Sequence, residues 1–203
     1  NDVLVLLAEA FLTAEVEAVY SQYAFAVYPI AVQASGASAR VAPALPANGA
    51  QPLGHDPSAL MAAICQRTRL LFLANPNNPT GTWMDDAALD ALLSAVPPEV
   101  IVVLDEAYHE YSAAHGVPDG SRWLARHPNL VVTRTFSKAH GLAGLRVGYA
   151  LSHPDLADLL NRVRQPFNVS LPGLAAAAAA LDDHEHLEAT LALNHAGIAR
   201  LRA

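Results

Sequence analysis

Three apolar runs in the middle of the chain have the pattern of buried strands. Each is four or five residues long, consists almost entirely of aliphatic or aromatic residues and is followed at once by polar ones. The runs are Leu70–Ala74, Val100–Leu104 and Leu130–Thr133. Continuous apolar runs bounded by turn residues are typical of strands buried on both faces of a parallel sheet. A fourth run, Val147–Leu151, follows the third so closely that we expect it to return antiparallel.

Segments with helical spacing of apolar residues alternate with these strands, and several begin at a capping residue or a proline. The expected helices are Asp2–Leu12, the stretch capped by Ser21 through Gln33, Pro57–Gln66, Asp85–Val96, Pro154–Arg164, Leu171–Leu181 and Asp183 to the end, and two further short strands are Glu15–Tyr20 and Ala39–Ala42. This alternation predicts an α/β fold in three layers, α/β/α, around a mostly parallel sheet.

The chain becomes wholly helical after Pro154, and prolines at 166 and 172 separate the last helices. We therefore expect residues 1–165 to form one large domain and residues 166–203 to form connecting helices and the start of a smaller domain. The first predicted element is a helix with no strand before it, so the large domain is expected to be incomplete at its N-terminus.

The amino-acid composition and net charge exclude several classes of protein. The 203 residues are 53% apolar and 15% charged, which favours a globular fold over disorder. A net charge of −7 gives no reason to expect nucleic acid or an anionic membrane as a partner. One cysteine, Cys65, fits a reducing compartment, and we expect a cytoplasmic protein. His184 and His186 lie two apart, on different helix faces, so no metal site is predicted.

Polar side chains follow each of the three buried strands. They are Asn78, in the sequence NPNNPTG, then Asp105 with Tyr108, and finally Lys138. Ligands of open parallel sheets lie beyond the carboxyl ends of the strands, so we expect these groups to share one site. Taken singly, each has a simpler explanation: NPNNPTG as a turn, Asp105 as a cap and Tyr108 as an aromatic at the core edge.

Together these residue types suit pyridoxal phosphate. An amine just past a buried strand can act as a nucleophile, the role of Lys138, and can later carry a proton. A buried carboxylate, Asp105, would raise the pKa of the pyridine nitrogen. Asn78 and Tyr108 could donate hydrogen bonds to the ring's 3-oxygen. Three other side chains would hold the phosphate, namely those of Thr135, Ser137 and Arg146.

At these residues the chain resembles the fold-type I pyridoxal-phosphate aminotransferases. The stretches that carry the resemblance are NPNNPTGT, DEAYHEY and RTFSKAHGLAGLRVGY. They most resemble the histidinol-phosphate branch, which implies reversible amino transfer between histidinol phosphate and 2-oxoglutarate in histidine biosynthesis, and a homodimer. The resemblance implies catalytic roles for Lys138, Asp105 and Tyr108. It also implies an aromatic ring stacked on the cofactor, from Tyr23 or alternatively Phe25.

The chain departs from the family pattern in length. Family members have an N-terminal arm, a phosphate loop before the first helix, and a small domain that supplies an arginine for the substrate carboxylate. Three alternatives therefore stay open: an aromatic amino-acid aminotransferase, a threonine-phosphate decarboxylase, and a truncated, inactive fragment. A Rossmann-type nucleotide binder is less well supported because no G-x-G-x-x-G follows a strand.

Overall fold

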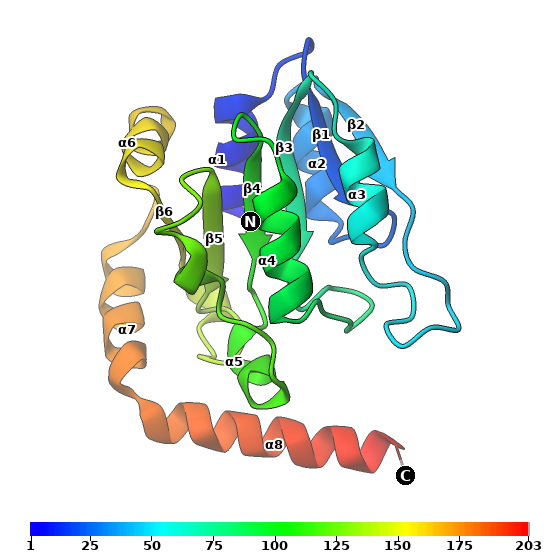
Figure 1. Cartoon of the computed structure of the whole chain (residues 1–203). Coiled ribbons are helices and arrows are strands. Elements are labelled where there is room, and N and C mark those ends of the chain that lie inside the picture. Colours follow the sequence, from blue (N-terminus) through cyan, green and yellow to red (C-terminus); the bar gives the residue numbers. More distant parts are fainter. Residues whose placement is uncertain (203) are drawn as a thin grey trace.

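A computed structural model describes residues 1–202, and these residues are organised around one six-stranded sheet (Figure 1). The strand order is β2-β1-β3-β4-β5-β6. The strands are β1 (Glu17–Ser21), β2 (Ser38–Ala42), β3 (Thr68–Ala74), β4 (Ile101–Asp105), β5 (Leu130–Thr135) and β6 (Gly148–Ser152). The first five are parallel and β6 runs antiparallel to β5. The predicted mostly parallel sheet and its antiparallel return are confirmed.

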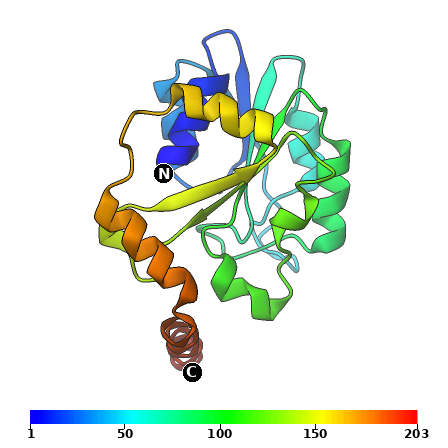
Figure 2. The same cartoon turned by 90° about the vertical axis from the view of Figure 1, so that its left-hand side faces the viewer.

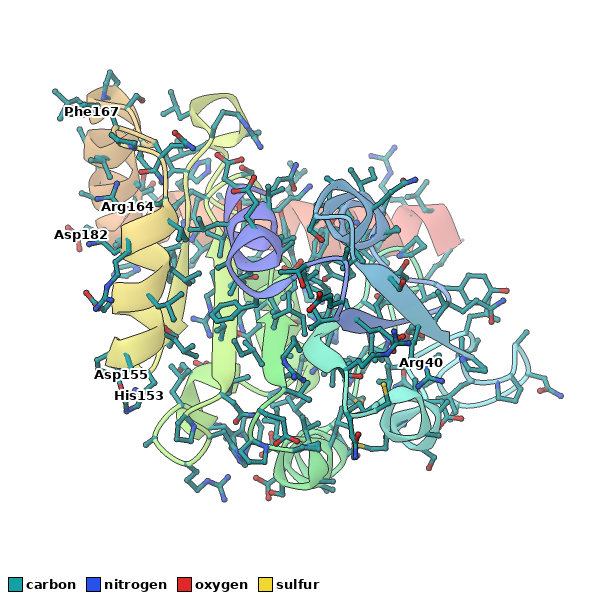
Figure 3. All side chains as sticks on the ribbon, turned by 90° about the horizontal axis from the view of Figure 1, so that it is seen from above. Arg40, His153, Asp155, Arg164, Phe167 and Asp182 are labelled. Atoms are coloured by element: carbon teal, nitrogen blue, oxygen red, sulfur yellow. The ribbon has the colours of Figure 1, made fainter. Side chains whose placement is uncertain are left out.

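Helices cover both faces of the sheet. They are α1 (Asp2–Phe11), α2 (Val27–Ala34), α3 (Pro57–Ala63), α4 (Asp86–Ala95), α5 (His109–Ser112), α6 (Pro154–Val163), α7 (Leu171–Asp182) and α8 (His184–Arg202), with short 3₁₀ turns at Ala113–His115, Gly120–Trp123 and Ala143–Leu145. Seen from above, α1 and α2 lie on one side of the sheet and α3 and α4 on the other (Figure 3). The three predicted layers are confirmed.

Alternate side chains of the central strands enter two separate cores. On β3, Leu70 and Phe72 pack with α1 and α2, whereas Leu71 and Leu73 pack with α3 and α4. All four side chains are fully buried, because both faces of the sheet are covered. A strand buried on both faces has no polar positions, which is why its sequence reads as an unbroken apolar run.

Two predicted boundaries were wrong. Ser21 does not cap a helix; it is the last residue of β1, where it pairs with Ala42, and α2 begins only at Val27. The sheet register decided this, because a buried Ser21 continues the strand. The third helix ends at Ala63 rather than Gln66. The Cys65 N–H bonds to the Thr68 hydroxyl (2.9 Å) and the Thr68 N–H to the Cys65 carbonyl (2.9 Å), which turns the chain into β3.

The last two helices lie outside the sheet layers. Ala177 of α7 packs on Phe136 and Val147, beside β5 and β6. Helix α8 contributes no buried side chain among the described residues and runs below α5 (Figures 1 and 2). No helix within residues 1–202 combines the length and hydropathy needed to cross a bilayer.

Candidate active site

One cavity of about 660 Å³ lies at the carboxyl ends of β3, β4 and β5. The first turn of α1 and the connection between α6 and α7 complete its walls. Of the eight side chains that the sequence predicts for the site, seven line this cavity: Asn78, Asp105, Tyr108, Thr135, Ser137, Lys138 and Arg146. Residues up to 68 positions apart (Asn78 to Arg146) are brought together because parallel strands end at a common edge.

The aromatic wall of the cavity comes from Phe25, the alternative to Tyr23. Phe25 is among the lining residues, and Tyr23 is not. Tyr23 instead accepts a hydrogen bond at its main-chain carbonyl from Asn77 Nδ2 (2.7 Å), and its side chain is partly exposed. The segment before α2 thus turns Phe25, rather than Tyr23, toward the predicted site.

The three asparagines of the NPNNPTG segment have different roles: two stabilise the turn and one lines the cavity. Asn75 forms reciprocal bonds with the main chain of Met84, at 3.1 and 2.8 Å. Asn77 is also buried and bonds within the turn to Thr80 Oγ1 (2.8 Å). Asn78 faces the cavity and donates through Nδ2 to the Tyr108 hydroxyl at 3.4 Å. The first two shape the turn that presents the third.

Asp105 is the last residue of β4 and is 7% exposed. Its Oδ2 accepts a hydrogen bond from the Tyr28 hydroxyl (2.9 Å), and its Oδ1 accepts one from the Ala107 N–H (3.2 Å). Burial raises the pKa of Asp105, and these two hydrogen bonds oppose that rise by favouring the charged form. Tyr28 was missed by the sequence analysis, which placed it inside a longer helix with no polar role.

Lys138 stands on a short loop between two buried anchors. Phe136 and Ala139 on either side are buried, while the lysine is exposed toward the cavity. The loop is closed by bonds from the Phe136 N–H to the Val147 carbonyl (3.1 Å) and from the Leu142 N–H to the Phe136 carbonyl (2.9 Å). Lys138 Nζ lies 5.4 Å from the centre of the Tyr108 ring. The Lys138 amine is thus exposed to the cavity, while the loop that carries it is packed into the core on both sides of the lysine.

The far end of the cavity is suited to an anion. The Thr135 hydroxyl accepts from the Ser137 N–H (3.1 Å), which bends the chain there. Arg146 adopts a left-handed backbone (φ 58°), uncommon for a residue with a side chain and often found at functional sites. The first turn of α1, from Asn1 to Val3, also lines the cavity, and helix N-termini present free N–H groups to anions. This contribution of α1 was not predicted from the sequence.

An ion pair joins the wall of the cavity to the interior: Arg134 lines the cavity and is partly buried, and its partner Glu106 is buried. Glu106 Oε2 accepts from Arg134 Nε (2.9 Å) and Nη2 (2.7 Å), and Oε1 accepts from the Gly120 N–H (2.6 Å). Arg134 Nη2 also donates to Asp119 Oδ1 at 2.6 Å. Burial raises the pKa of Glu106 to about 7, with the Arg134 guanidinium acting in the opposite direction. The pair ties the end of β4 to β5 next to Asp105.

Gly120 has no room for a side chain, which gives a test of this region. A Cβ at this position would lie 2.7 Å from Glu106 Oε1 and would collide with Leu104 Cδ2. We expect Gly120→Ala to lower the free energy of unfolding by about 1–3 kcal/mol, the usual effect of overpacking, as measured by urea denaturation. Gly197→Ala on α8 is the control: no atom lies within 4 Å, and helix propensity favours alanine there. Equal stability of Gly120→Ala and wild type would contradict the tight packing.

Comparisons with known proteins show the family of this chain. Residues 1–203 match the family described as aminotransferase class I and II. The chain is 58% identical over 201 residues to histidinol-phosphate aminotransferase 2 of Pseudomonas aeruginosa, covering 99% of this chain and 53% of that protein. It is 52% identical to histidinol-phosphate aminotransferase 1 of Nitrosococcus oceani, with the same two shares. The chain thus spans about half the length of the curated relatives it matches.

Among solved structures, histidinol-phosphate aminotransferase from Sinorhizobium meliloti in complex with pyridoxal-5'-phosphate superimposes with a TM-score of 0.84 at 33% identity, covering 93% of this chain and 50% of that one. The family match covers residues 1–203, and the sequence and structural matches cover 99% and 93% of the chain. The chain belongs to the class I and II aminotransferase family.

Proposed function

We propose that the protein carrying this chain is a pyridoxal-phosphate-dependent histidinol-phosphate aminotransferase, which exchanges an amino group between histidinol phosphate and 2-oxoglutarate in histidine biosynthesis. The observation that carries the proposal is the convergence of Lys138, Asp105 and Arg146 on one cavity. Relatives at 52–58% identity that bear this enzyme name support the choice of substrate.

The cavity fits the cofactor in size and in chemistry. Its volume of about 660 Å³ lies within the range of small-molecule sites. When bound, pyridoxal phosphate supplies an electron-withdrawing ring that stabilises charge at the substrate carbon. Asp105 would accept a hydrogen bond from the ring nitrogen, and Asn78 and Tyr108 would donate to the ring's 3-oxygen. Phe25 would pack against a ring face.

The remaining residues would hold the phosphate and the aldehyde of the cofactor. Arg146, Thr135 and Ser137 would bind the phosphate, together with the N–H groups at the start of α1. Lys138 Nζ would hold the cofactor covalently at its aldehyde carbon, with release of water, and its free amine would be the group that carries a proton to and from the substrate carbon.

Our proposal extends to the whole protein. We assign residues 1–165 to the large, cofactor-binding domain and residues 166–203 to connecting helices that open a smaller domain. Exposed apolar side chains support this division. Phe167, 97% exposed, projects from the α6–α7 connection (Figure 3). Leu171 and Leu201 are also exposed. We further propose a homodimer located in the cytoplasm.

Reductive trapping tests cofactor attachment. Lys138 is the only lysine in the sequence, so borohydride treatment of protein mixed with pyridoxal phosphate should label a single side chain. Peptide mapping by mass spectrometry is expected to find the label on the peptide containing Lys138. Label found only on other amines of the protein, with none on the peptide containing Lys138, would contradict the assignment.

The amino donor is tested by comparing three compounds with the full-length protein. We expect histidinol phosphate to convert the bound cofactor to its amine form faster than phenylalanine does, and threonine phosphate to release no carbon dioxide. Preference for phenylalanine would favour the aromatic aminotransferase, and carbon dioxide release would favour the decarboxylase. Trapping at Lys138 without turnover of any donor would favour an inactive protein.

A further inference from the structure

Tyr28 is a fully buried tyrosine that joins two walls of the cavity without lining it. It lies in the first turn of α2. Its ring stacks on Phe72 of β3, with centroids 4.9 Å apart and planes 13° from parallel. On another side it meets the ring of Phe25 edge to face, at 5.8 Å and 87°. Because the ring is packed against two other rings in the core, the core sets the position of its hydroxyl.

The hydroxyl points at the carboxylate of Asp105. Tyr28 Oη donates to Oδ2 at 2.9 Å, across 77 positions of sequence, while Oδ1 is held by the Ala107 N–H. One donor on each oxygen fixes the plane of the carboxylate. Each carboxylate oxygen can accept two hydrogen bonds, so acceptor capacity remains for a group in the cavity.

We propose that Tyr28 is a positioning residue: its hydroxyl holds the Asp105 carboxylate in the orientation that receives the ring nitrogen of the cofactor. The inference rests on the proposed role of Asp105 and adds a residue that does not itself touch the cofactor. Through Phe25, the same side chain also supports the aromatic wall. Through Tyr28, helix α2 therefore contacts both the Asp105 carboxylate and the Phe25 ring, which lie in different walls of the cavity.

A purely structural role is the competing explanation. A buried phenol needs some acceptor, and Asp105 could be only that acceptor. Both explanations include the hydrogen bond from Tyr28 to Asp105, so both predict that losing the phenol oxygen raises the pKa of Asp105. They differ in the effect on the cofactor: only a positioning role predicts that the loss also weakens cofactor binding.

The test compares Tyr28→Phe with Tyr20→Phe. Tyr28→Phe keeps the ring contacts with Phe72 and Phe25 and removes only the donor. Tyr20 is a second buried tyrosine of the same core, on β1, and gives a matched loss of one phenol oxygen away from Asp105. The first measurement is the pKa of Asp105 in cofactor-free protein, by NMR of the labelled carboxyl carbon. We expect it to rise in Tyr28→Phe and to match wild type in Tyr20→Phe.

The second measurement is the dissociation constant for pyridoxal phosphate. We expect Tyr28→Phe to weaken binding by about tenfold, the equivalent of one hydrogen bond to a charged group, and Tyr20→Phe to change it little. An Asp105 pKa that is the same in wild type and Tyr28→Phe, or a raised pKa with an unchanged dissociation constant, would overturn the inference. Failure of wild type to bind the cofactor would instead overturn the proposed function, while the carboxyl titration would still decide what Tyr28 does to Asp105.

Discussion

Replacing Lys138 by alanine is expected to slow amino transfer by the full-length protein by about 10²–10⁴-fold or more, the range that a positioned proton carrier contributes. The variant also loses the amine that bonds to the cofactor, so the visible absorption of the lysine-bound form should disappear. Lys138 is the one lysine within these 203 residues. Single-turnover kinetics with histidinol phosphate and an absorbance scan measure the two effects.

Stability and chemical rescue separate a lost amine from a damaged fold. The side chain of Lys138 is exposed, and its loop is anchored by Phe136 and Ala139, so the free energy of unfolding should change by no more than about 0.5 kcal/mol. Added methylamine, which can enter the space left by the side chain, should restore part of the rate. Undiminished transfer by Lys138→Ala would remove this residue from the mechanism.

Replacing Arg134 by methionine is expected to lower the free energy of unfolding by about 3–5 kcal/mol, because it leaves a buried carboxylate without its partner. Glu106 is 1% exposed and receives two hydrogen bonds from the guanidinium. Arg162→Met is the control. Its ion pair with Asp158 is exposed on α6, and such pairs contribute no more than about 1 kcal/mol. Urea denaturation of the three proteins gives the comparison.

The pH dependence provides an independent check on this pair. The pKa of Glu106 is raised from 4.5 to about 7 in the folded protein, so stability from this group is present below pH 4.5 and is lost as the pH rises through about 7. Without the guanidinium the pKa rises further. The stability difference between wild type and Arg134→Met should therefore be smaller near pH 4.5 than above about 7. A difference that grows toward acid pH would show that Glu106 is not the group left unpaired.

Much of the fold was predictable because local patterns of apolar and polar residues indicate its strands. The runs 70–74, 100–104 and 130–133 are apolar at every or nearly every position, and only strands covered on both faces need that. The residues after them were expected to converge because parallel strands share one edge. Seven of the eight predicted side chains do line the cavity there.

The misses have a common physical origin. Serine is a common N-cap residue, yet Ser21 pairs with Ala42 and belongs to β1. Tyr23 and Phe25 are two aromatic residues two positions apart, and only the path of the chain into α2 decides which one faces the cavity. Nothing in the local sequence marks Tyr28 as a partner of Asp105, because the two lie 77 positions apart.

Short-range patterns of polarity were enough to predict the class of fold and the chemical character of the groups at the edge of the sheet. The order of the strands in the sheet, the aromatic ring that borders the cavity, the phenol that bonds to Asp105 and the arginine that pairs with Glu106 became known only from the folded structure. Those choices depend on where packed elements distant in sequence meet, and packing is a property of the folded chain as a whole.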